Sequence, residues 1–285
     1  MCKKQKKKYG HLPPKEAETT LWRRVNVDMI GPYTVRTPSR TIQLRAMTMI
    51  DPASNWFEVA ALPMGTSPSS DICQKLLDDV WLARYPRPME IGFDNGSKFK
   101  ALFRDLCANM GMKPKPTTAY NPQGNSILER AHQVLGNCLR TFQLGGRELD
   151  KHRPFDEFLT ATAYALQSTY HTTLGATPGQ TVFGRDMVLP VKFKANWALI
   201  QQRKQKVINA SNERENKKRI QHDYQVRDKV LLQKPGILTK LEVPYTGPHL
   251  ITQVHSNGTV VIQKGAFCER VNIRRVTPFF EDREG

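Results

Sequence analysis

The sequence lacks any hydrophobic run of the length that a membrane span requires, so an integral membrane protein with spanning helices is not expected. Five lysines fall within the first eight residues, but no apolar stretch follows them, so this end does not resemble a secretory signal. Acidic residues are also scarce, with 26 Asp and Glu against 43 Lys and Arg and a formal net charge of +17. This excess indicates an anionic polymer such as nucleic acid as partner. A basic protein of ribosomal type is the alternative that charge alone leaves open.

Cysteine is scarce and scattered. The five cysteines contain no Cys-x-x-Cys pair, and none lies near two histidines at the spacing of metal ligands. An odd number of widely separated cysteines is typical of reduced thiols in an intracellular protein. The sequence therefore predicts neither a zinc site nor a disulfide framework.

The first two thirds of the chain alternate between strand-like and helical patterns. Strands are predicted at residues 24–33, 43–50, 56–62, 89–93 and 113–118, and helices at residues 67–85, 99–110, 125–143 and 155–169. Turn signals between the first three strands predict an antiparallel meander. Pro114 and Pro116 restrict the last strand to a sheet edge. We expect an α/β fold with a five-stranded mixed sheet flanked by helices.

The pattern changes toward the C-terminus. A polar, charged helical stretch covers residues 196–222, and short strands follow it at residues 226–232, 250–254, 259–262 and 270–276. Asn257 and Gly258 form a strong hairpin signal between two of these strands. Four segments are therefore expected: a basic, largely disordered tail at residues 1–20, an α/β core at 21–190, a helical linker at 191–223 and a small all-β barrel at 224–280.

Three carboxylates suggest a chemistry. Asp28 and Asp94 belong to strand-like runs, and Glu129 lies inside a helical pattern. Taken singly, each is more often a turn residue, a helix cap or a solvated charge. A charge beside Val27 in a half-buried strand is unfavourable unless it is paired or bound to metal, and the small residues at 95–97 let a polymer backbone approach closely. Two strand-borne acids and one helix-borne acid can hold two Mg²⁺ or Mn²⁺ ions, which clamp the oxygens of a phosphodiester during displacement. The sequence therefore predicts a protein that cuts or joins DNA.

Several basic residues are candidates for DNA contacts. Lys98 and Arg130 flank the acids, although a stabilising salt bridge explains Lys98 equally well. Arg140 follows Glu129 by eleven residues and so returns to nearly the same helix face, where a solvated arginine is the alternative. The barrel adds three arginines suited to contacts that do not depend on base sequence: Arg270, Arg274 and Arg275.

The order of the three acids, with 34 residues between Asp94 and Glu129, resembles the D,D,E triad of retroviral and retrotransposon integrases. The resemblance covers about residues 9–280. Four stretches are similar to segments of that family: residues 93–97, 121–125, 177–190 and 247–276. The last two resemble the Gypsy-type long-terminal-repeat elements in particular.

The resemblance implies an RNase H-like catalytic core at residues 21–190, in which Asp28, Asp94 and Glu129 bind two Mg²⁺ or Mn²⁺ ions and a C-terminal barrel binds DNA. It implies an enzyme that trims the ends of element DNA and joins their 3′-hydroxyls to target DNA. The implied partners are both DNAs, further copies of the chain and a chromatin factor, and the implied location is the nucleus.

Two departures from the family pattern are present. The N-terminal zinc module pairs two His with two Cys, but the matching region holds only Cys2, so residues 1–20 look like the end of a truncated module. Retroviral relatives also carry DNA-contacting basic residues where this chain has Gln133 and Gly136. A DNA-binding or chromatin-tethering remnant without catalysis therefore remains an alternative. A nuclease that cuts RNA in hybrids is a third reading, which the Gypsy-type stretches do not favour.

Overall fold

The computed structural model describes residues 8–36, 41–94, 102–117, 126–144, 154–234 and 242–280. These residues form two compact units: one between residues 17 and 204, and one from residues 8–16 together with residues 205–280. In the part of the chain that is described, no helix is long and apolar enough to span a bilayer.

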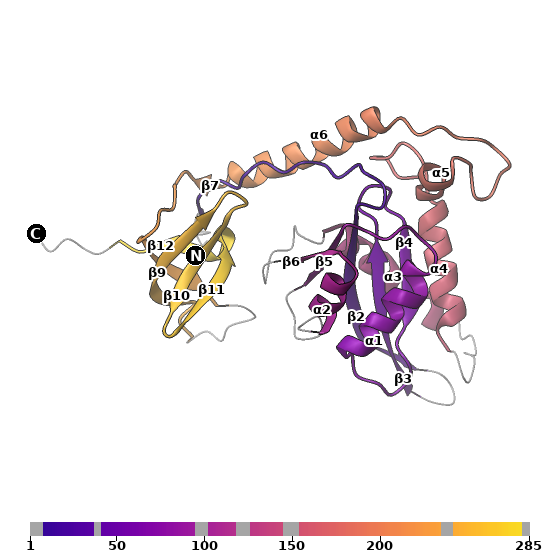
Figure 1. The fold of residues 1–285 in the computed structure, drawn as a ribbon, viewed down its shortest axis with the longest axis horizontal. Helices are drawn as coiled ribbons and strands as arrows, with labels where there is room; N and C mark the ends of the chain where they lie inside the picture. Colours follow the sequence, from indigo (N-terminus) through magenta and orange to yellow (C-terminus); the bar gives the residue numbers. More distant parts are fainter. Residues whose placement is uncertain are drawn as a thin grey trace, which may run out of the picture. The chain divides into compact units, whose positions relative to one another are not determined.

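The first unit is built on a mixed five-stranded sheet (Figure 1). Its strands are β2 (Arg24–Arg36), β3 (Thr41–Ile50), β4 (Phe57–Ala61), β5 (Glu90–Asp94) and β6 (Lys113–Thr117). Their order in the sheet is β4-β3-β2-β5-β6, with β2, β3 and β4 antiparallel and β5 and β6 parallel to β2. The predicted α/β fold, the mixed sheet and the meander are therefore confirmed.

Helices cover both faces of this sheet. On one face lie α1 (Ser70–Leu77), a π-helical turn (Asp78–Leu82) and α2 (Leu102–Asn109), which share a buried core with Val27 and Phe93. On the other face lie α3 (Ser126–Leu144) and α4 (Asp156–Ser168), and here Leu135 and Leu139 of α3 pack against β2 and β3. The short helix α5 (Pro178–Phe183), which begins with a capping box at Thr177, was not predicted.

Strand β2 contains a bulge that changes which side chains face α3. Between Ile30 and Tyr33 the pairing with β3 shifts: Gly31 and Pro32 together stand opposite Arg45, so β2 carries one extra residue there. Gly31 has φ +89°, and a Cβ there would lie 2.3 Å from a carbonyl oxygen of β3, so only glycine fits. Side chains alternate along a strand, so Tyr33 would otherwise face away from Asp28. With the bulge, Tyr33 shares the face of Asp28.

Strand β6 forms one edge of the sheet, as its prolines predicted. Pro114 and Pro116 pair in register with Ile91 and Phe93 of β5. The amide of Lys113, at the start of β6, donates to a carbonyl oxygen on the inner side. Proline has no N–H to donate to a ladder, and this confines such residues to an edge.

The second unit contains a five-stranded antiparallel sheet in the order β11-β10-β9-β8-β12. Its strands are β8 (Lys229–Gln233), β9 (Tyr245–His255), β10 (Thr259–Lys264), β11 (Phe267–Asn272) and β12 (Val276–Pro278). The strand predicted at residues 270–276 is in fact the end of β11, a 3-10 turn (Ile273–Arg275) and β12. The Asn272 side chain accepts a hydrogen bond from the Arg274 amide and so caps that turn. Helix α6 (Trp197–Asn216) precedes this sheet and ends before residue 222.

The expectation of a largely disordered tail at residues 1–20 is wrong for the described part. Strand β1 (Lys8–Tyr9) pairs with β7 (Arg219–Ile220), and Leu12 is buried in the core of the second unit. Arg219 donates hydrogen bonds to the carbonyl oxygens of Tyr9 and Gly10. The partners of this segment lie some 200 residues away, so its local charge and prolines did not indicate them. Residues 1–7 lie outside the described residues.

Candidate active site

The first two predicted acids occupy neighbouring positions in the sheet. The parallel ladder of β2 and β5 ends at the pair Val27 and Phe93, and the next residues are Asp28 and Asp94. Asp28 is half-buried, and its Oδ1 accepts a hydrogen bond from the Met29 amide at 2.8 Å. The side chain of Asp94 lies outside the described residues, and its backbone ends β5.

The third acid, Glu129, lies exposed in the first turn of α3, and a short chain of hydrogen bonds connects this helix to the strand of Asp28. The Thr48 hydroxyl donates to the Asp28 carbonyl oxygen at 3.1 Å, and His132 Nε2 lies 2.8 Å from the same hydroxyl. A hydroxyl has one hydrogen, so the imidazole donates its Nε2–H to Thr48. Because His132 follows Glu129 by three residues, the two side chains lie on one helix face. This chain fixes the helix of Glu129 against the strand of Asp28.

Protonation of His132 should destabilise the folded chain, because it places a charge on a buried imidazole. Burial lowers the pKa of the His132 imidazole to about 4. The unfolded chain, with an ordinary histidine pKa near 6.5, then binds more protons than the folded chain, so stability is lost as the pH falls from about 6.5 to 4. The loss should reach about 3 kcal/mol and should be smaller in His132→Asn, which donates but does not titrate. Burial also lowers the pKa of His171, so His171→Asn separates its contribution.

Calorimetry at a series of pH values measures the loss, and the NMR signals of the imidazole report the titration directly. A His132 imidazole that titrates near pH 6.5 in the folded protein would contradict the assignment.

The donor set suits a hard divalent cation. Asp28, Asp94 and Glu129 offer carboxylate oxygens, the ligands that Mg²⁺ and Mn²⁺ prefer. Among the described side chains, no three His, Cys, Asp or Glu groups already surround a common point. The side chain of Asp94, which carries the second carboxylate, is not among these described side chains.

The basic residues that were predicted to contact DNA differ in their exposure and in their hydrogen-bond partners. Arg130 and Arg140 are both exposed on α3, and Lys98 lies outside the described residues. The Arg140 guanidinium folds back along the helix, where Nε donates to the Gly136 carbonyl oxygen at 3.4 Å and Nη2 bonds to Asn137. On β11, Arg270 is exposed and donates to the Thr259 hydroxyl at 2.9 Å.

Arg274 and Arg275 do not lie on the surface where DNA contacts were expected. Both residues are 8% exposed. Arg274 forms a two-pronged ion pair with Glu215 of α6 at 2.6 and 2.8 Å, and Arg275 donates to the Gln233 carbonyl oxygen. Their burial does not favour the predicted contacts with DNA: Arg274 pairs with α6 and Arg275 bonds to β8, and sequence pattern alone could not place either partner.

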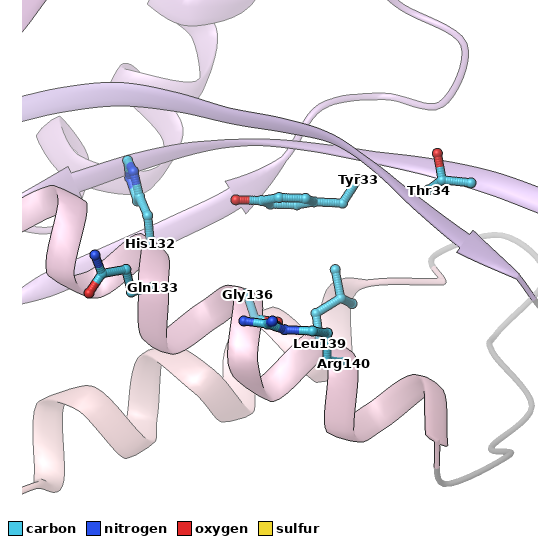
Figure 2. A pocket seen from close by; sticks show the side chains of 7 residues that line it. All are labelled: Tyr33, Thr34, His132, Gln133, Gly136, Leu139 and Arg140. Atoms are coloured by element: carbon cyan, nitrogen blue, oxygen red, sulfur yellow. The ribbon is translucent and has the colours of Figure 1, made fainter. Parts of the chain in front are cut away.

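A groove between β2 and α3 was not predicted. Figure 2 shows Tyr33 and Thr34 of β2 opposite His132, Gln133, Gly136 and Arg140 of α3. Its volume is about 460 Å³. Only the helical spacing of Gln133, Gly136 and Arg140 after Glu129 was visible in the sequence. The strand side could not be foreseen, because the bulge in β2 decides which way Tyr33 faces.

No family model matches the chain. The retrovirus-related Pol polyprotein from transposon 412 of Drosophila melanogaster is 25% identical over 263 residues, which is 84% of this chain and 20% of that polyprotein. The Gag-Pol polyprotein of gibbon ape leukemia virus is 28% identical over 232 residues, which is 77% of this chain and 13% of that polyprotein. The chain thus spans a fifth or less of these relatives.

A solved structure supports the fold. A chain in the cryoEM structure of the simian T-cell lymphotropic virus intasome in complex with PP2A regulatory subunit B56 gamma aligns with a TM-score of 0.61. The identity is 15%, and the alignment covers 96% of this chain and 85% of that chain. The sequence relatives are thus Pol polyproteins of a transposon and a retrovirus, and the fold, with its RNase H-like core, is similar to that of a chain in a retroviral intasome.

Proposed function

We propose that the chain is a DNA integrase, a polynucleotidyl transferase that trims the ends of element DNA and joins their 3′-hydroxyls to target DNA. The observation that supports the proposal is the placement of the elements that carry the three acids: Asp28 and Asp94 follow the last pair of one parallel ladder, and the helix of Glu129 is hydrogen-bonded to the strand of Asp28 through His132 and Thr48. The Pol relatives and the integrase fold agree with this assignment.

In the proposed reaction the three carboxylates bind two Mg²⁺ or Mn²⁺ ions, which when bound activate the attacking oxygen and stabilise the leaving oxygen. The sheet supplies position: β2 and β5 hold Asp28 and Asp94 side by side. Helix α3 carries Glu129, and its packing against β2 and β3 limits its movement. Positioning of reacting groups in this way accounts for a large part of such a rate enhancement.

The proposal also covers the source of the DNA, the residues that contact it, the partners of the chain and the location of the reaction. The stretches at residues 177–190 and 247–276 favour a Gypsy-type retrotransposon as the source of the element DNA. The net charge of +17 favours DNA as the partner, and exposed Arg130, Arg140 and Arg270 are the contacts we propose, with Lys98 as a further one. We further propose that copies of the chain assemble on DNA, that a chromatin factor directs them, and that the reaction takes place in the nucleus.

The test is joining of labelled duplex oligonucleotides to plasmid DNA with Mg²⁺, with Mn²⁺ and with EDTA. We expect joined product with either metal ion and none with EDTA. A branched duplex that mimics the joined product is assayed in parallel, because its reversal needs the chemistry but less of the assembly.

Absence of both activities, with DNA binding intact, would contradict the proposal and favour a tethering remnant. Cleavage of RNA in a hybrid duplex without any DNA joining would favour the nuclease reading instead.

A further inference from the structure

We infer that the second unit contains a binding site for an extended peptide, and that residues 9–15 of this chain occupy the site as a separable ligand. These residues form the strap. The site accepts a peptide with the pattern aromatic-Gly-x-Leu-Pro, which the strap carries from Tyr9 to Pro13. All of the site lies in the second unit, and the three proposed catalytic acids lie in the first.

The backbone of the strap is bound by side chains, as the backbone of a peptide ligand is. Residues 11–15 belong to no helix or strand, so their backbone groups depend on other partners. Asn216 binds Leu12 at both backbone groups: its Oδ1 accepts from the Leu12 amide at 2.8 Å, and its Nδ2 donates to the Leu12 carbonyl oxygen at 3.1 Å. Asn216 thus supplies the pair of hydrogen bonds that a residue of a neighbouring strand would supply.

Further donors from α6 bind the C-terminal half of the strap. Asn212 Nδ2 donates to the Pro13 carbonyl oxygen at 3.1 Å, and Gln205 Nε2 donates to the Lys15 carbonyl oxygen at 2.8 Å. One face of α6 carries these donors, because Gln205, Asn212 and Asn216 are separated by seven and four residues. Figure 1 shows the indigo N-terminal segment running beside this helix.

The N-terminal end of the strap is bound in a similar way. Buried Arg219 donates from Nε and Nη2 to the carbonyl oxygens of Gly10 and Tyr9. The Gly10 amide donates in turn to the Ile220 carbonyl oxygen at 2.9 Å. Backbone hydrogen bonds of this kind recognise an extended chain whatever its side chains are, so the specificity of the site comes from its side-chain pockets.

Three positions of the strap fit closely against the second unit. Leu12 is 5% exposed and lies in the apolar core. Gly10 has φ +75°, and a Cβ there would lie 2.9 Å from the ring of Tyr224. Pro13 lies against Gly258, where a Cβ would lie 2.8 Å from Pro13 Cδ. The site therefore selects glycine, leucine and proline at these three positions.

The strap is held by contacts and not by neighbouring chain. Lys15 and its partner Gln205 are 190 residues apart in the sequence. Leu12 is the one buried side chain of the strap, whereas the core that it joins contains residues from β8, β9, β10, β11 and β12. Segments with few buried apolar contacts open at a lower free energy than the core that they cover. The strap can therefore leave its site while the sheet of the second unit stays folded.

The experiment opens the site and supplies the strap as a separate peptide. Leu12→Asp in the full-length chain places a charge in the apolar core, which should release the strap. A fluorescein-labelled peptide with the sequence of residues 8–17 is titrated against this variant. We expect fluorescence anisotropy to show binding at least about tenfold tighter than to the wild type, because the tethered strap of the wild type competes at a high effective concentration.

The peptide and the site have separate controls. The peptide carrying Leu12→Asp, and a scrambled peptide of the same composition, should bind at least about tenfold more weakly. Asn212→Ala and Asn216→Ala, added together to the Leu12→Asp chain, should weaken binding by a similar factor. Gln202→Ala, which removes an exposed amide earlier on α6, should leave binding unchanged.

Thermal melting establishes which variants are folded and gives a second readout. A ligand stabilises the state that it binds, so the peptide should raise the melting temperature of Leu12→Asp and of the milder Leu12→Ala, and not that of the wild type.

No binding to either folded variant, or equal binding of the scrambled peptide, would overturn the inference. Variants that stay unfolded with the peptide present would overturn it as well, because the strap would then be an inseparable part of the fold. None of these measurements involves DNA or metal ions, so their failure is distinct from failure of the proposed joining reaction.

Discussion

Asp28→Asn should lower the rate of DNA joining by at least about a thousandfold, which corresponds to about 4 kcal/mol of transition-state stabilisation. Asparagine keeps the shape of the side chain and an oxygen that can accept from the Met29 amide, as Asp28 Oδ1 does at 2.8 Å. It lacks the negative charge that a divalent cation requires. Binding of duplex DNA and the melting temperature should therefore stay near those of the wild type. Single-turnover joining kinetics measure the effect.

The matched control is Asp71→Asn, an exposed acid in the first turn of α1 that should leave joining unchanged. Asp94→Asn and Glu129→Gln should resemble Asp28→Asn, because all three carboxylates are assigned to one site. Retained joining in Asp28→Asn at a rate within tenfold of the wild type would remove Asp28 from the catalytic set.

Glu215→Ala should destabilise the second unit by about 3 kcal/mol, because it leaves the buried Arg274 guanidinium without its counter-charge. The Arg274 side chain is 8% exposed and the Glu215 side chain 27% exposed. Burial opposes the charge of Glu215, but the hydrogen bonds and positive charge of Arg274 outweigh it and hold the pKa of Glu215 below its ordinary value. Stability from this pair is therefore present above the unfolded pKa and is lost as the pH falls through the folded pKa.

Scanning calorimetry of the full-length chain measures the transition of this unit. Glu213→Ala, two residues earlier on the same helix, is the matched control: Glu213 pairs with Lys217 in solvent, and its loss should leave the transition unchanged. The double variant Glu215→Met/Arg274→Met should recover the part of the loss that unpaired Arg274 causes, because apolar side chains of similar volume replace a buried pair with little loss. It should not recover the part due to Arg219, which also pairs with Glu215 at 3.8 Å. A double variant no more stable than Glu215→Ala would show that the charge left unpaired is not the cause.

Strands and helices with strong local patterns were predictable from the sequence. The alternation around Val27 and the apolar spacing of α1 indicated their elements, and Pro114 and Pro116 indicated the edge strand. Adjacency of Asp28 and Asp94 followed from their places at equivalent points of two strands, and the structure pairs those strands in register.

Features that depend on distant partners were not predictable. The residues next to Arg274 in the sequence do not indicate that it is buried. Only its ion pair with Glu215 distinguishes it from a surface arginine. In the sequence Leu12 belongs to a polar segment, but in the structure it is buried in the core of the second unit. The sequence did not indicate that Thr48 forms hydrogen bonds to His132 and Asp28, which join three segments of the chain. The bulge of β2 inverts the alternation on which the assignment of faces relied.

The edge strand β6 also determines whether a strand of another chain can pair with this edge of the sheet. The amide of Lys113 points inward to a carbonyl oxygen, and the alternating positions Pro114 and Pro116 have no hydrogen to offer outward. The outer side of β6 therefore presents acceptors without donors at these positions. An approaching strand would leave its own carbonyl groups unsatisfied, so the sheet resists growth by strand addition at this edge. Copies of the chain can thus lie close together without polymerising through β6.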